Sequence, residues 1–229
     1  MKSKTKLFSL VSLGAFALLH ANAAPVVIAE KLLDGGEGFG WNSNSGGQQI
    51  ADKFSSTAGV NADSISFYGF YHNGSGTQIS HVDSFDILFF DDLSGTPSNT
   101  EFYSFTTAVT AGVDTTVNNT GEYDIYKWEF SIPEVDLSTP GDYWVSVRSN
   151  SSSPTWAWSF SENDATDPLI LRFGNDGDWI NLGTRFDSEN AFKIAGTEQV
   201  VPEPSTYAMF GTAFAMLAFV GHRARNRKS

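Results

Sequence analysis

Every second side chain is apolar in the stretch Tyr126-Lys127-Trp128-Glu129-Phe130-Ser131-Ile132. Successive side chains of a β-strand point to opposite faces of a sheet, so this period of two predicts a strand with one buried face. We therefore expect Trp128 to lie in the core, next to the side chains two residues before and after it.

The same alternation recurs on both sides of this stretch, and eight or nine such runs can be read in the middle of the chain. Turn-forming residues separate the runs. No convincing amphipathic helix lies between them, and parallel strands would need such crossovers. The fold class expected is therefore all-β, with an antiparallel, jelly-roll-like β-sandwich over residues 24–198. An up-and-down barrel is the alternative. The clearest runs are residues 65–71, 85–90, 143–148, 169–173 and 192–194.

The first residues of the chain have the pattern of a signal peptide. Three lysines precede an apolar run from Leu7 to Leu19, and small residues follow at Ala21 and Ala23. An apolar run of this length is too short to span a bilayer, which takes about 20 residues. The pattern predicts cleavage after Ala23, so that residues 1–23 are removed on export.

The last residues have three parts in a fixed order. The motif Pro202-Glu203-Pro204 comes first, an apolar segment from Tyr207 to Val220 follows, and a basic end closes the chain. A positive cluster after an apolar segment stays on the cytoplasmic side, so the segment predicts a short C-terminal transmembrane helix with the domain outside. The basic end runs from 222 to 228 and contains Arg223, Arg225, Arg227 and Lys228.

This tail, residues 199–229, resembles the PEP-CTERM sorting signal of Gram-negative bacteria that produce exopolysaccharide. The resemblance implies that an exosortase in the inner membrane recognises the tail and cleaves it near the motif. The protein would then be anchored transiently in the inner membrane before it reaches the cell envelope or the extracellular matrix. The runs 49–54, 141–147 and 191–196 also resemble jelly-roll ectodomains that precede such tails, and this second resemblance implies no activity.

The 229-residue chain contains no cysteine, which excludes disulfides and thiol catalysis. Residues 24–201 hold seven of the 14 basic residues and 25 of the 26 acidic residues, a formal net charge of −18. Such a charge repels phosphate backbones, so we expect no nucleic acid among the partners.

Motifs of the common enzyme classes are missing from the sequence. His72 and His81 flank a predicted turn at Asn73-Gly74 without metal-ligand spacing, and no nucleophile elbow or phosphate-binding loop occurs. A glycosidase needs two carboxylates about 5–10 Å apart, and the closest pair on a strand, Glu122 and Asp124, is followed on the same face by Tyr126. We therefore expect no enzymatic activity and no catalytic residues.

Two weaker candidate sites remain. Asp176 and Asp178 lie in a Gly-rich loop whose oxygen atoms could bind Ca²⁺, although Asp and Asn also favour turns for backbone reasons. Trp156 and Trp158 would share one strand face and could stack on sugar rings, although tryptophans in alternating strands are more often core residues. The sequence thus predicts a non-enzymatic surface or matrix protein without a required cofactor. A carbohydrate-binding module for exopolysaccharide is the alternative, and a glycosidase is the third reading.

Overall fold

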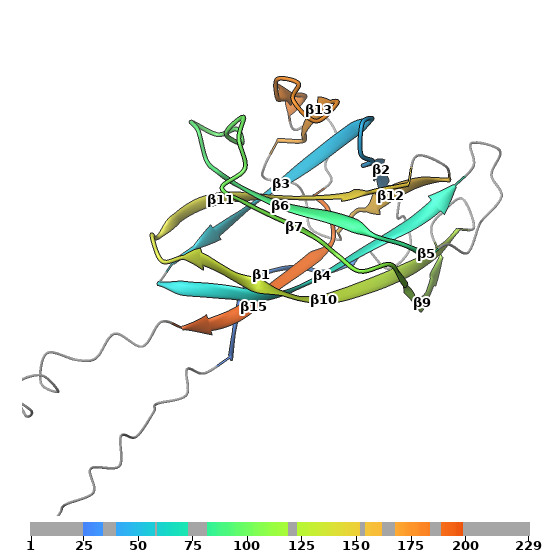
Figure 1. Cartoon of the computed structure of the whole chain (residues 1–229), viewed down its shortest axis with the longest axis horizontal. Helices are drawn as coiled ribbons and strands as arrows, with labels where there is room; N and C mark the ends of the chain where they lie inside the picture. The colour runs from blue at the N-terminus through green and yellow to red at the C-terminus, as the bar shows by residue number, and fades with distance from the viewer. Residues whose placement is uncertain are drawn as a thin grey trace, which may run out of the picture.

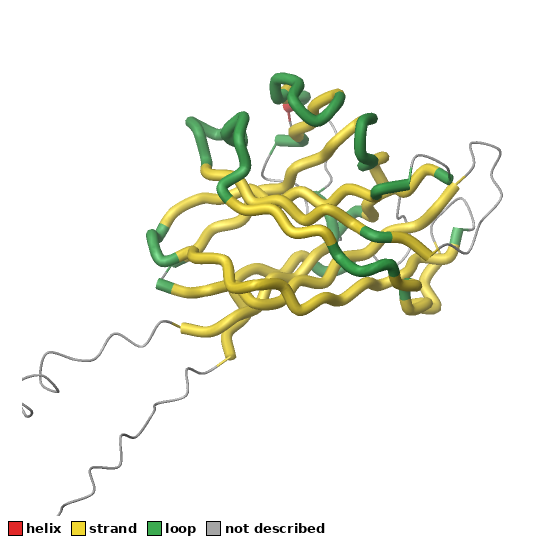
Figure 2. The backbone as a smooth tube through the Cα atoms, viewed as in Figure 1, coloured by secondary structure: helices red, strands yellow, loops and turns green. Residues whose placement is uncertain are grey.

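The structure is a computed structural model that describes residues 25–33, 40–57, 59–72, 82–118, 123–151, 154–161, 168–183 and 189–198. Strands and their connecting loops make up these ranges apart from a single 3₁₀ position at Gly183, and no α-helix occurs in them (Figure 2). The strands are β1 (Pro25–Lys31), β2 (Gly40–Asn42), β3 (Gln48–Ser56), β4 (Val60–His72), β5 (Val82–Asp83), β6 (Phe85–Asp91), β7 (Tyr103–Thr106), β8 (Thr110–Ala111), β9 (Val113–Asn118), β10 (Asp124–Leu137), β11 (Gly141–Ser149), β12 (Thr155–Ser159), β13 (Ile170–Phe173), β14 (Ile180–Asn181) and β15 (Phe192–Glu198).

Two antiparallel sheets face each other in two layers (Figure 1). The first sheet has the order β1-β15-β4-β10-β9, with β12 paired to β4 and β2 paired to β12. The second sheet has the order β14-β13-β3-β11-β6-β7, and β5 and β8 pair separately. The expected all-β fold with antiparallel sheets is confirmed. Among the described residues, none forms a helix long and apolar enough to cross a membrane.

Aromatic side chains from both sheets fill the space between the layers. Trp128 of β10 is 2% exposed, which confirms its expected place in the core. Its ring centroid lies 6.0 Å from that of Phe67 on the same sheet and 5.2 Å from that of Phe85 on the opposite sheet. Tyr126 and Phe130 are half-buried and pack against the same cluster. The side chains of β10 that face the core are therefore the ones that the sequence pattern predicts.

A glycine lets one of these rings approach its neighbouring strand. A Cβ atom at Gly69 of β4 would lie 2.5 Å from Nε1 of Trp156, too close for any side chain. Gly69 thus makes room for the Trp156 indole, which is fully buried.

Part of the second sheet is buried on both faces, which differs from the simple alternation expected. In β6, Phe85, Ile87 and Phe89 face the first sheet, and the outward-facing Leu88 and Phe90 are also buried. Leu88 and Phe90 pack with Ala51, Trp144 and Ile170 in a second apolar cluster, with Trp179 half-buried against it.

The loops after β6 and β13 lie on the outer side of the second sheet (Figure 1), where this second cluster is buried. In the loop after β6, Asp92 accepts a hydrogen bond from Nε1 of Trp144 at 2.8 Å. In the loop after β13, Nε1 of Trp179 donates to the backbone oxygen of Ser98 at 3.0 Å and so ties the two loops together. The outward apolar side chains are buried because these loops fold back over them.

Both ends of the domain lie at the same end of the sandwich, which we call the entry end. Pro25 at the start of β1 is paired with Thr197 near the end of β15. Val60 is paired both with Glu198 and with Leu137, so the turn between β10 and β11 also lies at the entry end. Figure 1 shows these strand ends together at the lower left.

Candidate functional site

The tryptophans that the sequence suggested for sugar binding lie in the core. Trp156 and Trp158 do share a face, but it faces the second sheet, and both are 0% exposed. The Trp158 Nε1 donates to the backbone oxygen of Ala191 at 3.0 Å, and the two indole rings stack with centroids 6.5 Å apart. A sugar needs an open ring face for stacking, so these residues form no glycan site and the suggestion is wrong.

The suggested calcium ligands are exposed in the loop after β13. Asp176 and Asp178 are open to solvent, and the described residues contain no group of three or more His, Cys, Asp or Glu side chains able to hold a metal ion. The neighbouring Asn175 uses its Oδ1 to accept bonds from Arg148 at 2.7 Å and from the Gly46 amide at 3.2 Å. Calcium binding therefore stays a prediction without a site in this part of the chain.

Several other sequence-based assignments lie outside the described residues. They include His81, the leader with Ala21 and Ala23, the sorting motif Pro202, Glu203 and Pro204, the apolar segment 207–220, and the basic end with Arg223, Arg225, Arg227 and Lys228. His72 is described: its Nε2 lies 2.8 Å from Oδ1 of Asn42, and burial lowers the pKa of its ring.

A buried ionic cluster joins the two sheets near β1 and β3. Lys31 Nζ lies 2.5 Å from Asp52 and 2.9 Å from Glu189, and Asp52 also accepts two hydrogen bonds from Asn190. Burial opposes the charge of Lys31, but the carboxylates of Asp52 and Glu189 outweigh it, so the pKa of Lys31 is raised above 10.5. Because Lys31 and Asp52 satisfy each other away from solvent, we assign this cluster to stability.

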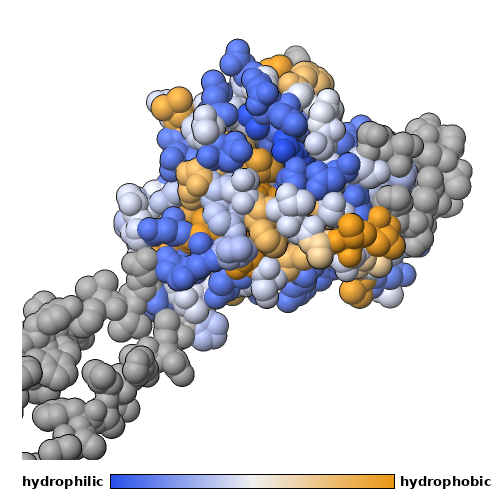
Figure 3. All heavy atoms as spheres, in the orientation of Figure 1, coloured by the Kyte–Doolittle hydropathy of each residue, from blue (hydrophilic) through white to orange (hydrophobic). Residues whose placement is uncertain are grey.

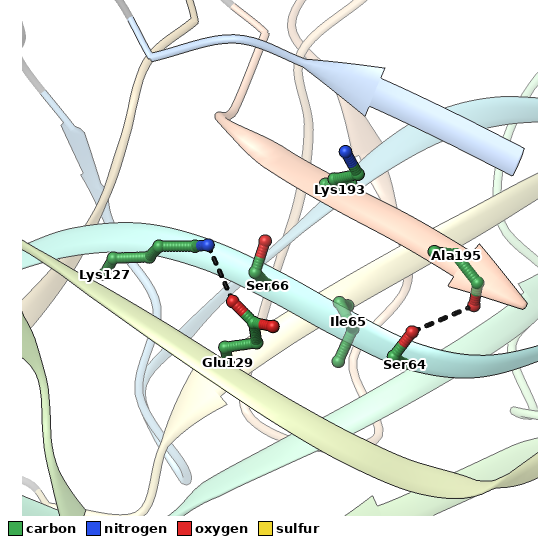
Figure 4. A pocket seen from close by; sticks show the side chains of 7 residues that line it. All are labelled: Ser64, Ile65, Ser66, Lys127, Glu129, Lys193 and Ala195. Carbon is green, nitrogen blue, oxygen red and sulfur yellow. Dashed lines mark hydrogen bonds and ion pairs between the residues drawn. The ribbon is translucent and has the colours of Figure 1, made fainter. Parts of the chain in front are cut away.

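A shallow hollow lies on the outer face of the first sheet (Figure 4). Its volume is about 160 Å³, and Ser64, Ser66, Lys127, Glu129 and Lys193 are its polar lining residues. Lys127 is paired with Glu129 at 2.7 Å, and Lys193 with a glutamate of β1 at 3.1 Å. Ligand pockets usually measure about 300–1,000 Å³. Since the hollow is smaller and its charges are already paired, it is the weaker candidate.

A larger groove, of about 490 Å³, lies at the entry end, and we call it the entry groove. Its volume falls within the usual range for ligand sites. It runs between the end of β6 and the turn from β10 to β11, which the pairing of Tyr143 with Asp91 brings together. Its lining residues are Asp91, Asp92, Phe102, Asp136, Ser138, Thr139, Pro140, Gly141, Asp142 and Tyr143.

An aromatic pair supplies the apolar part of the entry groove. Phe102 is 41% exposed, and its ring centroid lies 5.9 Å from that of Tyr143 and 6.4 Å from that of the buried Phe89. The Tyr143 hydroxyl donates to the backbone oxygen of Thr139 at 2.6 Å, which fixes this ring against the turn. The groove therefore contains the partly exposed ring of Phe102, which packs against the more deeply buried rings of Tyr143 and Phe89.

Four carboxylates line the entry groove together with this ring, and only one of them is paired with a cation among the described residues. Asp142 lies 2.8 Å from Nζ of Lys53, whose hydrogen bond lowers the pKa of Asp142. Asp92 accepts bonds from Trp144 and from the Gly95 amide. Hydrogen bonds from Ser138 lower the pKa of Asp136. The side chain of Asp91 is exposed and has neither a hydrogen bond nor an ion pair with any described residue, while its backbone oxygen accepts a bond from the Ser98 amide at 2.9 Å. The entry groove is thus strongly negative at neutral pH.

The sequence identifies the two turns that line this groove but does not show that they lie next to each other. Asp91-Asp92 and Pro140-Gly141-Asp142 are recognisable as turn residues, and nothing in a linear pattern shows that the two turns are neighbours. Phe102 lies outside the alternating runs, so no periodic signal marks it as exposed. Comparisons of the chain with protein-family models and with curated proteins find no match.

Proposed function

We propose that this protein is an exported, non-enzymatic surface or extracellular-matrix protein whose jelly-roll-like domain is sorted by its C-terminal tail. The observation that supports this most directly is the pairing of β1 with β15, which places both ends of the domain at the entry end. A leader removed after Ala23 and a tail processed after Glu198 would both leave the core unchanged, since the core lies between the sheets. The domain would be tethered by one end, with its loops at the opposite end projecting away from the inner membrane.

Two carboxylates of the entry groove support the absence of activity in this proposal. A glycosidase needs one carboxylic acid whose pKa is raised so that it can protonate the leaving group. In the entry groove, hydrogen bonds lower the pKa of Asp136 and of Asp142, so both are ionised at neutral pH. Neither can serve as that acid.

Mass spectrometry of the envelope and secreted fractions of the native host tests the sorting proposal. We expect peptides from residues 24–198 and no peptides from Tyr207 to Ser229. Abundant surface protein that still contains Arg223 to Lys228 would show that the tail is retained and that the proposal is wrong.

A variant tests whether the exosortase recognises the motif Pro202-Glu203-Pro204. Replacement of Pro202-Glu203-Pro204 by three alanines should leave the precursor in the inner membrane, because the exosortase would no longer recognise it. The matched control replaces Gln199-Val200-Val201, which precede the motif, and should be processed normally. Normal processing of both variants would contradict a role for the motif.

A carbohydrate-binding module is the second candidate, and one observation favours it. The entry groove presents the partly exposed Phe102 ring among carboxylates and hydroxyls, a combination that suits the apolar face and the hydroxyls of a sugar. Binding of a glycan by the purified protein, with loss of binding in Phe102→Ala, would support this candidate. Binding that Phe102→Ala leaves unchanged would remove its basis.

A further inference from the structure

We propose that the entry groove binds a glycan that carries free amino groups, such as a polymer of unacetylated amino sugars. This inference rests on the second function proposed above, the carbohydrate-binding module, and is independent of the sorting by the tail. Its basis is the combination of one exposed ring, three carboxylates that have no cation partner within the described part of the chain, and two hydroxyl side chains within one groove of about 490 Å³.

The ring selects a ligand with a flat apolar face. Phe102 is 41% exposed although it packs against Tyr143 and Phe89, so part of the side chain is accessible to a ligand while two aromatic neighbours hold it in position. A pyranose ring has such a face, and an ammonium group is also attracted to the face of an aromatic ring. An amino sugar offers both.

The charge selects a cation. Asp91, Asp92 and Asp136 lie in the groove without an ion pair to any residue that the structure describes, and Lys53 is paired with Asp142. A cleft lined by charges of one sign concentrates ligands of the opposite sign. Polymers with carboxylate, sulfate or phosphate groups would be repelled, so an amino-bearing glycan fits the groove better than an acidic one.

The side chains of the groove favour a glycan over an extended peptide. A peptide commonly binds by adding a strand to an open sheet edge, where backbone groups are free. At the groove, β6 is paired with β11 and β7, and β11 with β3 and β6, whereas the end of β10 is paired with β4 alone among the described strands. The lining residues offer side-chain oxygens, among them the hydroxyls of Ser138 and Thr139, which suit a ligand rich in hydroxyl groups.

Isothermal titration calorimetry of the full chain in a mild detergent tests the proposal with three oligosaccharides of equal length. They are a glucosamine oligomer, its N-acetylated counterpart and a neutral glucose oligomer. We expect the glucosamine oligomer to bind at least about tenfold more tightly than the other two, with an affinity that falls as salt is added. Phe102→Ala should lower the affinity about tenfold, and Asp91→Asn several-fold with a weaker salt dependence.

Matched control variants lie outside the groove. Phe173 is 62% exposed and lies beside Gln48, at the opposite end of β3 from the entry groove. Phe173→Ala and Asp178→Asn remove the same groups there and should leave binding unchanged. Urea unfolding of each variant would establish that Phe102→Ala and Asp91→Asn remain folded.

Three results would overturn the proposal. Equal affinity for the N-acetylated oligomer would show that charge is not recognised. Unchanged binding in Phe102→Ala would place the ligand elsewhere. Tighter binding of an oligolysine peptide than of the glucosamine oligomer would assign the groove to cationic peptides. In each case the sorting of the protein would be unaffected, so failure here is distinguishable from failure of the sorting proposal.

Discussion

The outer faces of the two sheets are built from the same strand alternation but have opposite environments. On the first sheet, the outward residues Ser64, Ser66 and Lys127 line an open polar hollow (Figure 4). On the second sheet, the outward residues Leu88 and Trp144 are 2% and 0% exposed under two loops. An alternating pattern therefore identifies which side chains share a face, but only the loops decide whether the second face is covered.

The two ends of the sandwich differ as well. The entry end has the acidic groove, whereas the opposite end, near β5, β8 and β9, exposes aliphatic side chains (Figure 3). Val82, Val109 and Val113 are 53%, 68% and 71% exposed there. β5 and β8 pair only with each other among the described strands, and a two-stranded ribbon is a marginal support by itself. The strands at the entry end therefore have more pairing partners than the ribbon of β5 and β8 at the opposite end.

The largest expected effect tests whether the covered face is a second core. Trp144→Ala should lower the free energy of unfolding by about 3–5 kcal/mol, as much as Trp128→Ala between the sheets, because both replacements empty a buried site. Urea denaturation of both variants measures the difference. A loss below about 1 kcal/mol for Trp144→Ala would show that the loops do not cover this face in solution.

Loss of the cation from the ionic cluster between the sheets should lower the free energy of unfolding by almost as much. Lys31→Met leaves Asp52 and Glu189 buried without their cation, which typically costs about 3–5 kcal/mol. Because the pKa of Lys31 is raised on folding, its contribution is fully present below pH 10.5 and is lost as the pH rises further.

Urea midpoints measured across the alkaline range should show this dependence. Part of the alkaline loss should disappear in Lys31→Met, while the part due to Tyr71 remains, since burial and Asp83 raise the pKa of its hydroxyl as well. Identical alkaline profiles for the wild type and Lys31→Met would contradict the role assigned to Lys31.

Cations on the two outer faces should differ in their importance. Arg172 is 1% exposed, lies 4.5 Å from the ring centroid of Trp179 and 5.4 Å from that of Phe90, and donates to Gln49 at 2.8 Å. Arg172→Met should cost about 1–2 kcal/mol through the lost cation–π contacts and hydrogen bond. Lys127→Met on the open face removes a surface pair and should change stability by less than about 1 kcal/mol. If Arg172→Met and Lys127→Met lowered the stability equally in thermal or urea unfolding, the expected difference between the two outer faces would be wrong.

The smallest effect is expected from a chelator. The loop with Asp176 and Asp178 is held over the covered face by protein contacts of Asn175 and Trp179. We therefore expect EDTA to leave the urea midpoint unchanged. A marked decrease with EDTA, restored by Ca²⁺, would make calcium a structural cofactor and would reopen the assignment of this loop.

Much of the strand content could be predicted from the sequence, because the period of two is local and β-branched and aromatic residues are frequent in the runs. The core position of Trp128 is confirmed for this reason. The suggestion for Trp156 and Trp158 failed at the next step: the pattern grouped them correctly on one face but could not tell that this face lies against the second sheet. The entry groove was missed because its two turns are about 50 residues apart in the chain and meet only through the pairing of β6 with β11.

By itself, the sequence determined the strand class, the face shared by each set of side chains, the acidic charge, and the expectation of an exported protein with a sorting tail. These properties depend on near neighbours in the chain or on composition. Only the tertiary structure decided that Pro25 lies beside Thr197, that the outer face of the second sheet is covered, and that Asp91, Phe102 and Asp136 line one groove. Each of these depends on which distant strands pair and in which register, and a period of two is compatible with many such pairings.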